Sequence, residues 1–98
     1  MNRYADVVDH FGVANQCKKL NEESYELIEA ILMYETTLAN DDSDYRKHIT
    51  EELSDVLLLI IEFMNYYKIS VEEIDSFVEY KINRTEERIK SGYYNDKH

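Results

Sequence analysis

The sequence lacks proline and tryptophan, and its 98 residues include only two glycines and one cysteine. Most β folds need glycine and proline at short intervals for their turns, so this scarcity favours long helices. The single Cys17 excludes an intramolecular disulfide framework and a cysteine-based zinc site, and it is typical of a reducing compartment such as the cytoplasm. The absence of a glycine-rich phosphate loop excludes the P-loop class of nucleotide enzymes.

Basic residues are few, because 11 Lys and Arg stand against 21 Asp and Glu, for a net charge of −10. Such a surface repels nucleic acid and anionic membranes, so we expect neither as a main partner. The N-terminal residues mix acids with apolar side chains, unlike a signal peptide. The longest apolar run, Val56 to Ile61, is far shorter than the roughly 20 residues of a membrane span. We therefore expect a cytoplasmic protein.

Apolar residues recur at helical spacing in four segments of the chain. The last segment begins with Ser70 and Glu73, which have the spacing of a capping box, and it ends near Gly92, a suitable C-terminal cap. The expected helices cover residues 4–11, about 16–38, about 43–67 and about 70–92, with a break at 40–44. The sequence thus predicts an all-α, four-helix single domain over residues 1–98, with a core at about 16–92 and a loose tail at 93–98.

The run from Val56 to Ile61 is apolar on nearly every side of its predicted helix. A helix of this kind is buried on several sides, and a chain this small has little protein to cover it. We therefore expect helical hairpins to pair across a subunit interface, in a homodimer or homotetramer.

Two acidic pairs lie on the core-facing side of the central helices. Glu23 and Glu26 are three residues apart, as are Glu52 and Asp55, so each pair shares one helical face. On a helical wheel of 100° per residue, Glu23 falls within about 60° of Leu20 and Leu27, and Glu52 falls within about 40° of Val56 and Phe63. The other acidic pairs of this chain are expected to be solvated surface.

Carboxylates at the edge of a core must protonate, pair with cations or bind a metal. Oxygen ligands of this kind suit Mg²⁺, with Mn²⁺ as a possible substitute. A structural acid cluster paired to lysine or arginine is the alternative. In the fourth helix, Lys81, Arg84 and Arg88 form a basic stripe that would suit a substrate with several phosphates.

The segments KLNEESYEL (residues 19–27) and EELSDVL (residues 51–57) carry the strongest resemblance. They resemble the E-x-x-E…E-x-x-D signature of MazG-like nucleotide pyrophosphohydrolases, within the all-α NTP pyrophosphatase superfamily. That superfamily also holds dimeric dUTPases and phosphoribosyl-ATP pyrophosphohydrolases. The resemblance covers about Lys19 to Gly92.

This resemblance implies Mg²⁺-dependent hydrolysis of a nucleoside triphosphate to its monophosphate and pyrophosphate. It implies four metal ligands, namely Glu23, Glu26, Glu52 and Asp55. Glu22 is then an outer carboxylate or helps to activate water. The implied phosphate-binding residues are Lys19, Lys81, Arg84 and Arg88. Two other functions stay open: a phosphoribosyl-ATP pyrophosphohydrolase, and a non-catalytic helical dimerisation or adaptor protein with a structural acid cluster.

Overall fold

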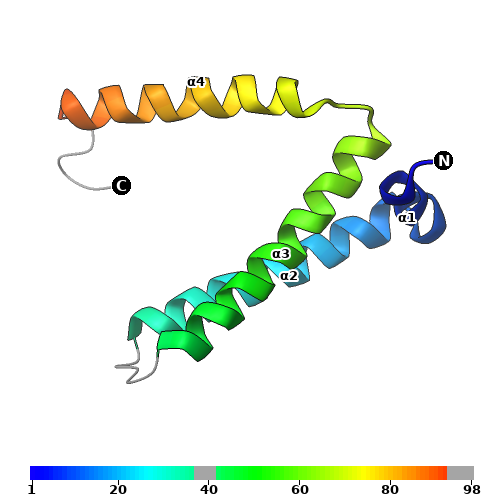
Figure 1. Cartoon of the computed structure of the whole chain (residues 1–98), viewed down its shortest axis with the longest axis horizontal. Helices are drawn as coiled ribbons and strands as arrows, with labels where there is room; N and C mark the ends of the chain where they lie inside the picture. Colours follow the sequence, from blue (N-terminus) through cyan, green and yellow to red (C-terminus); the bar gives the residue numbers. More distant parts are fainter. Residues whose placement is uncertain (37–41, 93–98) are drawn as a thin grey trace. The chain divides into compact units, whose positions relative to one another are not determined.

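The computed structural model consists of helices joined by short connections (Figure 1). It describes residues 1–36 and 42–92, and no strand occurs among them, which confirms the all-α prediction. The helices are α1 (Arg3–Phe11), α2 (Val13–Thr36), α3 (Asp42–Tyr66) and α4 (Val71–Lys90). Residues 40 and 41 of the predicted break at 40–44, and the whole tail at 93–98, lie outside the described residues, whereas residues 42–44 already belong to α3.

The chain divides into two compact units, Met1–Tyr67 and Lys68–His98. We describe each unit by itself, and the single-domain organisation stays a prediction. In neither unit is any described helix both long enough and apolar enough to cross a bilayer.

Three helices form the first unit, in which α2 and α3 run antiparallel side by side and α1 contacts both (Figure 1). Gly12 separates α1 from α2 with a φ of 91°, a conformation that side chains with a Cβ rarely adopt. The helix resumes directly after this glycine, since the amide of Gln16 donates to the Gly12 carbonyl at 3.1 Å. This is why α2 begins three residues before the predicted start at Gln16.

Asparagine side chains fix the N-terminus of α1. The Asn2 carboxamide oxygen accepts from the amides of Tyr4 and Ala5, as expected of an N-cap. Its nitrogen donates to the side-chain oxygen of Asn65 at 2.7 Å. The same side chain thus starts α1 and attaches it to the C-terminal end of α3.

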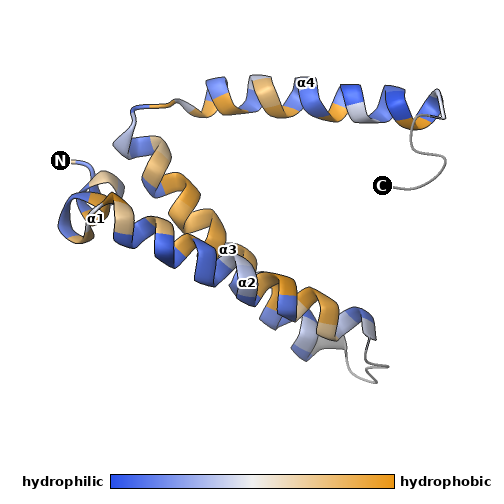
Figure 2. Ribbon diagram, turned by 180° about the vertical axis from the view of Figure 1, so that it is seen from behind, coloured by the Kyte–Doolittle hydropathy of each residue, from blue (hydrophilic) through white to orange (hydrophobic). Residues whose placement is uncertain are grey.

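The core of this unit is small. Only Val8, Ala30 and Leu59 are fully buried apolar residues among those described. Of the apolar run in α3, Leu59 is 1 % exposed, whereas Leu57 and Leu58 are 54 % and 47 % exposed. Figure 2 shows the hydrophobic stretch along α3. Much of the apolar surface of α3 therefore lies uncovered in a single chain, as the all-round pattern predicts.

Helix α4, in the second unit, begins at the predicted capping box. The Ser70 hydroxyl accepts from the Glu73 amide at 3.1 Å, and the Glu73 carboxylate accepts from the Ser70 amide at 2.8 Å. At the other end Ser91 is the cap, and Gly92 follows it with a φ of 81°. The predicted C-terminal cap is thus one residue too late, although the glycine supplies the positive φ that ends the helix.

Candidate functional site

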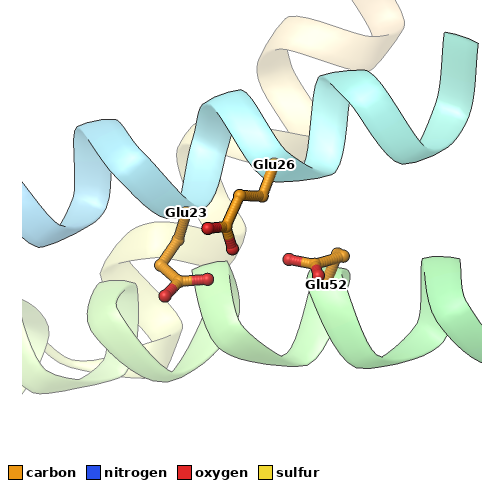
Figure 3. A group of neighbouring side chains, drawn as sticks. All are labelled: Glu23, Glu26 and Glu52. Atoms are coloured by element: carbon orange, nitrogen blue, oxygen red, sulfur yellow. The ribbon is translucent and has the colours of Figure 1, made fainter.

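Three glutamates from two helices meet between α2 and α3. Glu23 and Glu26 project from α2 toward Glu52 of α3 (Figure 3). Each contributes one carboxylate oxygen, and these oxygens all lie within 4.8 Å of one another. Contacts on both sides fix the antiparallel register, because Gln16 bonds Glu62 at one end and the rings of Tyr34 and Tyr45 lie 5.8 Å apart toward the other.

Helical periodicity explains why these side chains lie along one line of contact between α2 and α3. We call this line, with Glu23, Glu26, Glu52 and Asp55, the acidic seam. Gln16, Glu23 and Glu26 are separated by seven and three residues on α2, which is two turns and then one. The same steps separate Glu62, Asp55 and Glu52 in the opposite direction on α3. An antiparallel pair with this spacing brings acids of one helix against acids of the other, as the helical wheels predict.

Two of the carboxylates are partly removed from water. Glu23 and Glu52 are half-buried, while Glu26 is exposed. The Oε2 atoms of Glu23 and Glu52 are fully buried and have no hydrogen-bond partner among the described residues. A buried acceptor without a donor costs free energy, and the cost is larger for a charged group. The alternative of an acid cluster neutralised by lysine or arginine leaves these two oxygens unexplained.

The Glu23 carboxyl has its pKa raised above the ordinary value of 4.5. Burial is the largest cause, followed by the negative charges of Glu26 and Asp55. A hydrogen bond to Glu26 and the charge of Glu52 raise the pKa of Glu23 further. All of these effects disfavour the ionised form of Glu23. A bound cation would favour the ionised form and so offset them.

The other acidic residues of the predicted site lie at its edges. Asp55 is exposed and lies outside the three-glutamate group, but it is close enough for its charge to raise the pKa of Glu23. Glu22 is also exposed and shares a shallow groove on α2 with Glu26. The structure therefore brings together three of the four predicted ligands and leaves the fourth beside them.

The predicted phosphate-binding residues fall in both units. Lys19, on α2, is exposed and lies one turn from Glu23. On α4, Lys81 is exposed, and Arg84 and Arg88 are half-buried on the same helical face. The Arg84 guanidinium lies over the ring of Tyr80, 5.5 Å from its centroid. Since the two units are described separately, the approach of these three cations to the acidic seam stays a prediction.

The donor set of the seam fits a hard divalent cation. It offers only carboxylate oxygens, and two of the oxygens are buried without a donor. Mg²⁺ and Mn²⁺ prefer such ligands, whereas zinc sites commonly use histidine or cysteine. Among the described residues, Glu23, Glu26 and Glu52 are therefore the best placed to hold such a cation.

A buried polar pair at the end of the seam was not predicted from the sequence. The Gln16 amide nitrogen donates to the Glu62 carboxylate at 2.7 Å, and each side chain is only 4 % exposed. The sequence does contain a signal, because Gln16 precedes Glu23 by two turns and Glu62 follows Asp55 by two turns. A helical wheel extended seven residues back from Glu23 reaches Gln16, and one extended seven residues forward from Asp55 reaches Glu62.

Comparison with known proteins gives one informative match. The model of the MazG nucleotide pyrophosphohydrolase domain matches residues 11–89, which include every residue of the seam. No curated protein and no solved structure matches the chain.

Proposed function

The chain belongs to the MazG nucleotide pyrophosphohydrolase domain family, and from this premise we propose that it hydrolyses a nucleoside triphosphate to a monophosphate and pyrophosphate with Mg²⁺. The observation that carries the proposal is the pair of buried, unpartnered oxygens on Glu23 and Glu52, two members of the three-glutamate group between α2 and α3. A purely structural seam has no need of two such acceptors, whereas a cation site requires them.

In the proposed site, Glu23, Glu26, Glu52 and Asp55 hold the metal. Bound Mg²⁺ would polarise phosphoryl oxygens and offset the negative charge of the departing pyrophosphate. Mn²⁺ is expected to substitute, because it accepts the same oxygen ligands.

Glu22 is assigned to accept a proton from the attacking water, since it lies beside Glu26 in the exposed groove of α2. The water oxygen bonds to the α-phosphorus, and the bond from that phosphorus to the bridging oxygen breaks. Lys19 is assigned to bind phosphate oxygens one turn from Glu23, with Lys81, Arg84 and Arg88 as further phosphate ligands.

The direct test measures product release from a panel of nucleoside and deoxynucleoside triphosphates and phosphoribosyl-ATP, each with Mg²⁺ or Mn²⁺. The expected products are pyrophosphate and a monophosphate, separated by ion exchange. Release of orthophosphate and a diphosphate, or no hydrolysis of any member of the panel, would contradict the proposal. Hydrolysis of phosphoribosyl-ATP alone would replace the proposed substrate with that of the alternative enzyme.

We further propose that the active form is a homodimer or homotetramer that covers the apolar face of α3. Leu53 and Leu57 are 51 % and 54 % exposed and lie one turn apart on α3. Exposed leucines at adjacent turns form the kind of apolar patch that marks a subunit contact.

Leu57→Lys tests this assembly, because a charge placed in an apolar contact must be desolvated without a partner. Light scattering of the wild-type chain is expected to give a multiple of 11.7 kDa. The variant should associate at least about tenfold more weakly. Lys47→Glu, on an exposed polar position of the same helix, is the control and should leave the mass unchanged. A wild-type monomer at micromolar concentration would refute the assembly.

A further inference from the structure

A buried hydrogen bond joins α2 to α3 beyond the end of the acidic seam. Gln16 and Glu62 are the two buried polar side chains among the residues that the structure describes, and each is 4 % exposed. The Gln16 amide nitrogen donates to Oε1 of Glu62 at 2.7 Å. Neither residue belongs to the three-glutamate group. Their burial and their bond therefore need an explanation other than direct metal binding.

The bond lies too far along the helices to contact a cation in the acidic seam. Gln16 precedes Glu23 by seven residues on α2, and Glu62 follows Asp55 by seven residues on α3. Seven residues of helix span about 10 Å, whereas Mg²⁺ holds its oxygen ligands at about 2.0–2.1 Å. The pair can thus act on the cation only through the two helices or through the charge of Glu62.

A directional bond in a buried position sets how far one helix is displaced along the other. The apolar contacts of α2 and α3 tolerate sliding, because apolar attraction has no direction. The Tyr34 and Tyr45 rings, 5.8 Å apart, also tolerate it, since ring pairs interact over about 4.5–7 Å. The hydrogen bond is lost when its two atoms separate by about 1 Å more. A buried carboxylate then loses its donor, which costs more free energy than the loss of a neutral bond.

The metal ligands depend on this displacement, because they come from both helices. Glu23 and Glu26 belong to α2 and Glu52 belongs to α3, and their ligand oxygens lie within 4.8 Å of one another. Mg²⁺ requires nearly ideal octahedral geometry. A shift of α3 along α2 by about 1 Å is enough to spoil such a site.

We propose that Gln16 and Glu62 are positioning residues, whose bond holds α3 in the register at which Glu52 meets Glu23 and Glu26. The proposal rests on the metal site of the proposed function and adds two residues that do not contact the cation. Buried polar residues that fix the register of paired helices are the best-attested use of such groups.

Two conservative variants of Glu62 separate the bond from the charge. Glu62→Gln removes the charge but keeps an acceptor at the same reach, so Mn²⁺ affinity should stay within about threefold of the wild type. Glu62→Asp keeps the charge but shortens the side chain by a methylene, so Mn²⁺ should bind about tenfold more weakly. The charge alone predicts the opposite order, because losing a negative charge weakens cation binding.

The measurement is a titration of each purified chain with Mn²⁺, well below its melting temperature, in which electron paramagnetic resonance reports the free ion. Asn2→Ala is the control for a loss of stability alone. It removes the N-cap of α1 and the bond to Asn65, neither of which joins α2 to α3. It should lower the melting temperature and leave Mn²⁺ affinity unchanged. Gln16→Leu, which changes no charge, should lower the melting temperature and weaken Mn²⁺ binding about tenfold.

The outcomes distinguish the positioning role from the function on which it rests. If Glu62→Asp binds Mn²⁺ as tightly as the wild type, or if Glu62→Gln binds it more weakly than Glu62→Asp, the positioning role is overturned while the metal site stands. A wild-type chain that binds no Mn²⁺ and hydrolyses no triphosphate overturns the proposed function itself. If Gln16→Leu fails to fold, the two Glu62 variants still decide.

Discussion

Glu52→Gln is expected to lower Mg²⁺-dependent pyrophosphate release by at least about 100-fold. Glu52 is the α3 member of the three-glutamate group, and its buried Oε2 has no other partner. The amide keeps the shape of the side chain but loses the charge, so one anionic ligand disappears from the site without a cavity. Several kcal/mol of transition-state stabilisation depend on a bound metal, and each 1.36 kcal/mol is a factor of ten in rate.

Glu51→Gln is the matched control for this variant. It makes the same chemical change one residue earlier, at an exposed position outside the three-glutamate group, and should retain activity within about twofold. Because a lost ligand weakens metal binding, raising the Mg²⁺ concentration should recover part of the Glu52→Gln activity. Equal activity of the two variants at limiting Mg²⁺ would remove Glu52 from the metal site.

The sequence was sufficient to predict the acidic seam because helical periodicity determines both of its sides. Once Leu20, Leu27 and Ala30 are placed on the inner face of α2, Glu23 must share that face, and Ala30 is indeed 2 % exposed. The same reasoning places Glu52 beside Val56 on α3. The helical wheels predict that the acids of the two helices meet if the helices pack antiparallel, and α2 and α3 do pack in this way (Figure 1).

The sequence could not predict the partners of individual side chains. Helical periodicity can place Gln16 and Glu62 on the facing sides of α2 and α3, but the two residues lie 46 positions apart, and nothing local to either one indicates that they bond to each other. The start of α2 was also missed, because a single glycine with positive φ can end one helix and permit the next to begin at once. The exposure of Asp55 could not be predicted either. Asp55 lies one turn from Glu52 on the same helical face, yet its side chain is exposed at the edge of the three-glutamate group.

The acidic seam also has a measurable consequence for stability. Without metal at neutral pH, repulsion and burial act against the folded state at Glu23. A cation that binds only the folded form should therefore stabilise the chain strongly. At 100 times its Kd, Mg²⁺ should add about 2.7 kcal/mol to the free energy of unfolding. For a domain of this size that raises the melting temperature by roughly 10–20 °C.

The pH dependence of this stabilisation has a definite sign. The pKa of Glu23 is higher in the folded chain than its ordinary value of 4.5, so the folded state binds a proton more tightly than the unfolded state. The stabilisation from this group is fully present below pH 4.5 and is lost as pH rises through the folded pKa of Glu23. In metal-free buffer, Glu23 should thus favour the fold at acidic pH. The stabilisation by Mg²⁺ has the opposite pH dependence. It should shrink as pH falls through the same interval, because protons compete with the metal for the carboxylates.

Glu23→Gln separates the metal effect from general salt effects. At neutral pH in EDTA the variant should melt above the wild type, because it removes a charge that burial and Glu26 oppose. With Mg²⁺ the order should reverse, because the wild type gains the metal and the variant gains little. Glu35→Gln, exposed on the same helix, should follow the wild type in both buffers. A Glu23→Gln variant that melts below the wild type in EDTA would mean that the charge of Glu23 does not oppose folding. A variant that gains as much as the wild type from Mg²⁺ would mean that Glu23 does not bind the metal.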